Sequence, residues 1–200
     1  MAVWIIRKQS QNGVEQEKIA QKCNVTKVFT KKGYTNDYTK CYNLDDSRDA
    51  DNEGGNIMHS VFDVAKYILR EKGLMTTMKL QKLCYYAQAW SLAWDEKPLF
   101  DEDFQAWANG PVCPSLFFRH KGYYEVSEDF FDGEVPDFTD NEKDTINKVL
   151  EYYGNKEPQW LSNLTHSEQP WKEARGCAPI GMPCSNVITK ESMQIYYGGL

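Results

Sequence analysis

The chain has 200 residues, of which 41% are apolar and 14% aromatic, and a formal net charge of −6. This content excludes a disordered chain, and the sequence contains no uninterrupted apolar run of the ~18 residues that a membrane span requires. Residues 4–6 are too short for the apolar core of a signal peptide and are followed by Arg7 and Lys8. These features predict a cytoplasmic protein.

The charge is unevenly distributed along the chain. Residues 1–57 carry nine Lys/Arg and eight Asp/Glu, whereas residues 58–200 carry fourteen and twenty-one. Broad nucleic-acid binding needs a positive surface that displaces counterions. The acidic main part of the chain therefore makes nucleic acid an unfavourable partner.

The first 57 residues differ in composition from the rest. Residues 34–57 are polar and rich in turn formers, with too few apolar side chains to offset the entropy of ordering the chain. We therefore expect residues 1–57 to be a poorly structured N-terminal extension. Residues 53–55 (Glu-Gly-Gly) can also be encoded as a bacterial ribosome-binding sequence at the proper distance from a start codon at Met58. One hypothesis is thus that residues 1–57 are upstream sequence that is not translated.

One segment of this extension supports an alternative function. Residues 16–32 have the spacing of a helix-turn-helix, with Asn24 as the turn residue. Lys27, Lys31 and Lys32 would then contact DNA phosphates. The other interpretation is a short amphipathic helix with a charged face. The alternative function is a DNA-binding regulator of the protein's own operon.

The first strong helix signal follows Met58. Apolar residues recur at helical spacing over residues 59–70, which predicts an amphipathic helix. Ser60 and Asp63 have the spacing of a capping box, and Gly73 is positioned to end the helix.

A longer helix is predicted from Thr76 or Thr77 to Trp94. It is apolar nearly all round, so it should be central and buried. Lys79 and Lys82 lie in its first two turns, where the helix dipole disfavours cations. Either their aliphatic stems cover the core, or their ammonium groups meet an acidic group or backbone carbonyls.

The remaining elements are shorter. Extended pieces are predicted at residues 98–100 and 104–107, a turn at 109–111, a short helix at 112–120, a strand at 124–126 and an acidic loop at 129–138. Four further helices are predicted at residues 139–154, 158–165, 168–175 and 189–197, with an irregular loop at 177–188. The fold class is therefore mainly α with a small β element (α+β), as a single compact domain over residues 58–200.

Several motifs in this order resemble the Panacea domain, a family of SocA-like antitoxins and prophage-associated proteins. The motifs are Met-Thr-Thr-Met-Lys-Leu-Gln-Lys-Leu-Cys-Tyr-Tyr-Ala-Gln-Ala-Trp at 75–90, Phe-Gln-Ala-Trp at 104–107, Gly-Pro-Val-Cys-Pro at 110–114, Leu-Thr-His-Ser-Glu at 164–168 and Pro-Trp at 170–171. The resemblance covers residues 58 to about 197 and none of residues 1–57.

The resemblance implies an antitoxin encoded beside a toxin gene. Family members are understood to neutralise toxins by direct protein contact. The founding member also acts as an adaptor that delivers its toxin to a ClpXP-type protease. The expected partners are therefore a cognate protein toxin from an adjacent gene and, as a further step, such a protease.

Catalytic patterns are weak. His166 and Cys184 resemble part of the zinc-deaminase signature, but Val187 stands where the second cysteine is needed. Cys113 and His120 could form a nucleophile pair, although a buried thiol is the simpler interpretation. We therefore expect a protein that is not an enzyme and has no cofactor or metal, with an uncharacterised hydrolase as the remote alternative.

The motifs supply the candidate partner-binding residues, because aromatic anchors dominate protein interfaces. They are Lys79, Lys82, Tyr86, Trp107, Pro111, Val112, His166 and Trp171. Several alternatives remain open. Residues 110–114 are either a rigid connector or an exposed apolar ridge, and Trp171 belongs either to the core or to the interface. His166 either bridges two short helices or contacts a partner. The acidic residues 95–103 are either a solvated rim or an attractor for a basic toxin.

Overall fold

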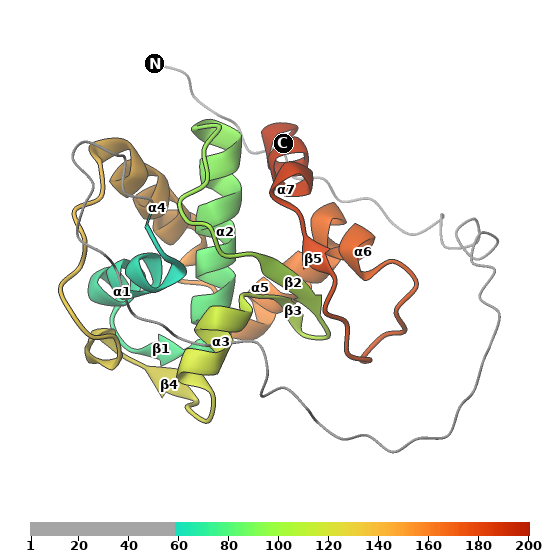
Figure 1. Ribbon diagram of the computed structural model, residues 1–200, viewed down its shortest axis with the longest axis horizontal. Coiled ribbons are helices and arrows are strands. Elements are labelled where there is room, and N and C mark those ends of the chain that lie inside the picture. Colours follow the sequence, from blue (N-terminus) through green and yellow to red (C-terminus); the bar gives the residue numbers. More distant parts are fainter. Residues whose placement is uncertain (1–58) are drawn as a thin grey trace, which may run out of the picture. The chain divides into compact units, whose positions relative to one another are not determined.

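The computed structural model describes residues 59–200, and the predicted fold class is confirmed for this part of the chain (Figure 1). The predicted N-terminal extension, the helix-turn-helix-like segment 16–32 and the proposed start at Met58 lie outside the described residues. In chain order the elements are α1 (Val61–Lys72), β1 (Met75–Thr76), α2 (Thr77–Trp94), β2 (Phe104–Trp107), β3 (Gly110–Val112), α3 (Pro114–His120), β4 (Glu125–Val126), the 3₁₀ helix η1 (Glu128–Phe130), α4 (Asp140–Tyr153), α5 (Pro158–Ser167), α6 (Gln169–Arg175), β5 (Val187–Ile188) and α7 (Lys190–Gly198). Among these residues, no helix combines the length and the apolar character needed to cross a membrane.

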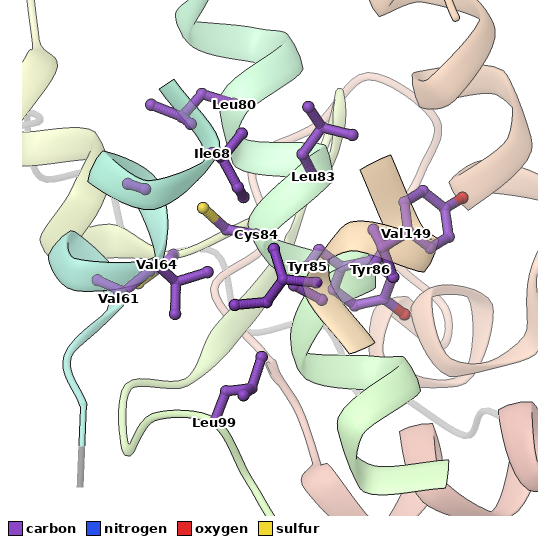
Figure 2. Packing of buried hydrophobic residues seen from close by; sticks show 14 of the residues in the cluster. Val61, Val64, Ile68, Leu80, Leu83, Cys84, Tyr85, Tyr86, Leu99 and Val149 are labelled. Atoms are coloured by element: carbon purple, nitrogen blue, oxygen red, sulfur yellow. The ribbon is translucent and has the colours of Figure 1, made fainter. Parts of the chain in front are cut away.

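Helix α2 is the centre of the domain, as its nearly uniform apolar surface predicts. It contacts α1, α4, α5 and α7, which lie around it in Figure 1. Figure 2 shows Leu80, Leu83 and Tyr86 of α2 among side chains of α1 and α4, such as Ile68 and Val149. Burying each large apolar side chain contributes about 1.5–3 kcal/mol. The α2 interfaces therefore supply much of the core energy.

The helix ends follow the local sequence signals. Ser60 and Asp63 form the predicted capping box of α1, and Gly73 ends that helix at φ 74°. Thr139 and Glu142 form the second predicted capping box, at the start of α4. His59, which precedes the capping residue of α1, packs its ring on Phe138 with 4.1 Å between centroids.

Two small antiparallel sheets complete the fold. In the first, β3, β2 and β5 lie in that order, and in the second β1 pairs with β4. The β2–β3 hairpin turns at residues 108–109, so Gly110 and Pro111 belong to β3 rather than to the predicted turn. Proline is compatible with this position because β3 is an edge strand. Strands β1 and β5 have two residues each, which is too short for an alternating pattern to predict them.

Candidate partner-binding site

Most of the candidate residues lie around the β2–β3 hairpin, and the first of them is a buried lysine. The Lys82 ammonium of α2 donates a hydrogen bond of 2.9 Å to the Pro111 carbonyl oxygen. This confirms the interpretation in which the ammonium group meets a backbone carbonyl. The side chain is only 1% exposed, and burial lowers the pKa of Lys82 to about 7 because water no longer stabilises the charge. No carboxylate lies within ion-pair distance of it among residues 59–200.

Gly110 makes the close approach of Lys82 possible. Its φ is 100°, a value that residues with a Cβ rarely adopt. A Cβ at this position would lie 2.9 Å from Lys82 Nζ and 2.7 Å from Thr165 Oγ1. The hairpin is therefore in contact with α2 on one side and with α5 on the other. Ser162 of α5 adds a hydrogen bond of 3.0 Å to the Asn109 carbonyl.

Helix α6 holds the other strand of the hairpin. The indole Nε1 of Trp171 donates to the Trp107 carbonyl at 3.0 Å. The Arg175 guanidinium donates to the Ala106 carbonyl at 3.0 Å and lies 5.2 Å from the centroid of the Trp171 ring. Both donors bond backbone carbonyl groups of β2 and so fix α6 against this strand. We call the group formed by Lys82, Trp107, Gly110, Pro111, Thr165, His166 and Trp171 the hairpin site.

His166 joins α5 to α6, as one sequence interpretation predicted. Its ring packs on Trp171 with 4.3 Å between centroids. Its Nε2 atom is buried and has no hydrogen-bond partner among the described residues. Burial, and to a smaller extent the charges of Lys82 and Arg175, lower the pKa of His166. The imidazole is therefore favoured in its neutral form.

A buried carboxyl group lies beside the hairpin site. Glu168, between α5 and α6, accepts hydrogen bonds from the hydroxyl groups of Tyr86 (3.1 Å) and Tyr197 (2.7 Å). Burial raises the pKa of Glu168 to about 7, against the opposing effect of these two hydrogen bonds. Tyr86 also stacks on Tyr153 with 4.1 Å between centroids. The predicted residue Tyr86 thus connects α2 to α4, α7 and the α5–α6 junction.

Exposure divides the eight predicted residues into two groups. Lys79, Trp107, His166 and Trp171 are half-buried and reach the surface. Lys82, Tyr86, Pro111 and Val112 are buried, so they position their neighbours in the isolated domain. Lys79 does not belong to the hairpin site. Burial lowers the pKa of Lys79, and the nearby Glu157 carboxylate acts in the opposite direction.

Sequence reasoning missed two buried amides of α2. The Gln81 side chain accepts from the Cys113 backbone N–H at 2.8 Å and donates to the Cys113 carbonyl at 3.2 Å. The Gln88 side chain bonds the backbone of residues 99 and 100 in the same manner. Two glutamines within a helix that is apolar nearly all round were the available signal, since buried amides need partners.

The arrangement of Cys113 and His120 does not favour the catalytic alternatives. His120 lies 3.0 Å from the Gln81 amide nitrogen, and burial raises the pKa of the Cys113 thiol to about 12. A thiol with that pKa stays protonated at neutral pH and is a poor nucleophile. In the part of the chain that the structure describes, no three His, Cys, Asp or Glu side chains are grouped to hold a metal ion.

One family model matches the chain. Residues 80–172, slightly less than half of the chain, match the family described as antitoxin SocA-like, Panacea domain. The resemblance to the Panacea family is therefore confirmed over this segment. The match includes the whole hairpin site, and of the eight predicted residues only Lys79 precedes it. No curated protein and no solved structure matches the chain.

Proposed function

We propose that this protein is an antitoxin that neutralises a cognate toxin, encoded by an adjacent gene, through direct protein contact in the cytoplasm. The observation that carries the proposal is the match of residues 80–172 to the SocA-like antitoxin family. That segment contains the hairpin site, so the residues with family resemblance are also those that the fold brings together.

A binding role fits the chemistry of the hairpin site better than catalysis does. Trp107 of the β2–β3 hairpin and Trp171 of α6 are half-buried aromatic side chains, and tryptophan is enriched among residues that dominate protein interfaces. The polar groups beneath them are used for bonds to the backbone, as at Lys82 and Arg175. Such groups hold a surface in shape and leave no evident nucleophile–base pair.

We infer a division of roles among the predicted residues. Lys79, Trp107, His166 and Trp171 reach the surface and would contact the toxin. The buried Lys82, Tyr86, Pro111 and Val112 would act through the position of the hairpin.

Co-expression with the product of each neighbouring gene tests the proposal. One neighbour should arrest growth when expressed alone and should be tolerated with this protein. His166→Ala should then weaken binding of the purified toxin about tenfold or more, which corresponds to ~1.4 kcal/mol. Lys121→Ala, at an exposed position after α3, is the matched control and should leave the Kd unchanged. Failure to restore growth against every toxic neighbour would contradict the proposal.

Delivery of the toxin to a ClpXP-type protease is a further step that we propose by resemblance to the founding family member. It predicts that the toxin's half-life shortens when this protein is co-expressed, and only in cells that contain the protease. Growth rescue with a stable toxin would mean that contact alone is sufficient.

A further inference from the structure

The negative charge of the described part is concentrated in one segment. Residues 59–200 contain fourteen Lys/Arg and twenty-one Asp/Glu, and residues 122–142 contain eight of these acids and no Lys or Arg. The rest is nearly balanced, with fourteen basic and thirteen acidic residues. This segment runs from β4 through η1 to the start of α4 (Figure 1). Its carboxylates therefore account for the whole net negative charge of residues 59–200.

Few of these carboxylates are neutralised within the described residues. Asp132 pairs with Arg119 at 2.7 Å, Asp137 with Lys143 at 2.8 Å, and Glu142 lies 3.5 Å from His59. The others have no ion-pair partner there, and they are Glu125, Glu128, Asp129, Glu134 and Asp140. Concentrated like charge opposes the compact state, so this arrangement is a cost for the isolated domain.

The same region displays apolar side chains. Leu74 directly precedes β1 and is 64% exposed, while Tyr123 and Tyr124 directly precede β4 and are 60% and 79% exposed. The backbone beneath them is fixed, because the Thr77 N–H donates to the Tyr124 carbonyl at 3.0 Å. Exposed apolar groups on an ordered surface are typical of interaction sites.

The pairing of β1 with β4 places these groups on either side of an acidic residue. The strands are antiparallel with Thr76 opposite Glu125, so Leu74 lies at one end of the pair and Tyr124 at the other. Three residue steps along a strand span roughly 10 Å. The strand pair thus carries exposed apolar side chains at both ends and the exposed Glu125 in one of its two strands. We define the β1–β4 face as Leu74, Tyr123, Tyr124, Glu125, Glu128 and Asp129.

We propose that the β1–β4 face docks a basic segment of a partner protein, in which Lys or Arg side chains alternate with apolar ones. The basic groups would pair with Glu125, Glu128 and Asp129, and the apolar groups would cover Leu74 and the tyrosines. Complementary charge of this kind also accelerates encounter. A second copy of this chain would present the same negative face and be repelled. The inference rests on the proposed function only in taking the partner to be the toxin.

A peptide titration tests the face without any toxin. The probes are a ten-residue synthetic peptide that alternates Lys with Leu, and a control peptide with Glu in place of Lys. Amide resonances of the full chain should shift at residues 74–77 and 122–130 with the basic peptide only, and the Kd should weaken at least tenfold between low and high salt. A footprint elsewhere, or equal binding of both peptides, would overturn the proposal.

Charge reversal tests the same face with the protein partner. Glu125→Lys with Asp129→Lys should weaken binding of the toxic neighbour's product at least tenfold, and so should Tyr124→Ala. The matched control is Glu173→Lys with Glu191→Lys, which changes the net charge equally at exposed positions of α6 and α7. Melting temperatures should not fall in any variant, because these side chains are exposed and the charge reversals at the β1–β4 face relieve like-charge repulsion.

The outcomes separate the two proposals. If the unaltered protein restores growth and the variants at the β1–β4 face bind the toxin equally well, the docking inference is wrong and the proposed function stands. If no neighbour is neutralised, the proposed function fails and the peptide footprint alone decides whether the face takes a basic segment. A dimer in sedimentation that Tyr124→Ala dissociates would also overturn the inference, since the face would then bind a second copy.

Discussion

Replacing Lys82 by methionine should make the free energy of unfolding less dependent on pH above neutrality. Burial lowers the pKa of Lys82 from 10.5 to about 7 in the folded chain. At about 1.36 kcal/mol per pKa unit, this difference corresponds to about 5 kcal/mol. Because the folded pKa is depressed, this contribution is fully present above pH 10.5 and is lost as the pH falls towards 7. Between pH 7 and pH 9, about 2 kcal/mol of it should appear.

Denaturant unfolding of both proteins at a series of pH values measures this effect. The difference in unfolding free energy between the unaltered chain and Lys82→Met should grow by about 2 kcal/mol in favour of lysine from pH 7 to pH 9. The loss of the hydrogen bond to Pro111 adds a further cost to Lys82→Met throughout this pH range. Lys121→Met, at an exposed site, is the control. A difference that stays constant across this range would refute the idea that burial controls the charge of Lys82.

Three further expectations concern the hairpin, the buried carboxyl and a helix end. Gly110→Ala should destabilise the fold by more than the ~1–2 kcal/mol that a left-handed backbone conformation costs a residue with a Cβ, because the new Cβ would also meet Thr165. Gly122→Ala is the control, because Gly122 has φ 94° but open space around it, so this variant measures the backbone cost alone. The unaltered chain should have its full advantage in unfolding free energy over Glu168→Gln below pH 4.5. This advantage should decline by about 3 kcal/mol as the pH rises through about 7, as measured by denaturant unfolding. Thr139→Ala should cost about 1 kcal/mol, because it removes the capping bond to the backbone of α4; an unchanged melting temperature would contradict this.

The sequence predicts those features whose causes are local. Ser60 with Asp63, and Thr139 with Glu142, specify helix starts within four residues. The central position of α2 follows from its apolar circumference, a property of the helix alone. The roles of Gln81 and Gln88 are not local in this sense, because Gln81 meets backbone groups 32 residues away.

The hairpin site was predicted only in part for the same reason. The family resemblance supplied residues such as Trp107 and Trp171 but not their exposure, because exposure depends on how α5 and α6 pack against the hairpin. The burial of Lys82 likewise depends on Gly110, whose lack of a Cβ leaves room for the ammonium group. Strand β5 could not be predicted, since its two residues pair with β2 across most of the domain's sequence.

Lys82 and Glu168 together predict an unusual pH profile for this fold. The glutamate contribution falls as the pH rises from 4.5 through about 7, and the lysine contribution rises from about 7 to 10.5. Their sum has its minimum near pH 7, where most domains are close to their greatest stability. Lys82 bonds to Pro111 and Glu168 to two tyrosines, so the sites share no partner and their effects should add. The double variant Lys82→Met with Glu168→Gln should therefore lose the minimum and match the sum of the single variants. A double variant that retains the minimum would place its cause in other groups, and a departure from additivity would show that the two buried charges interact.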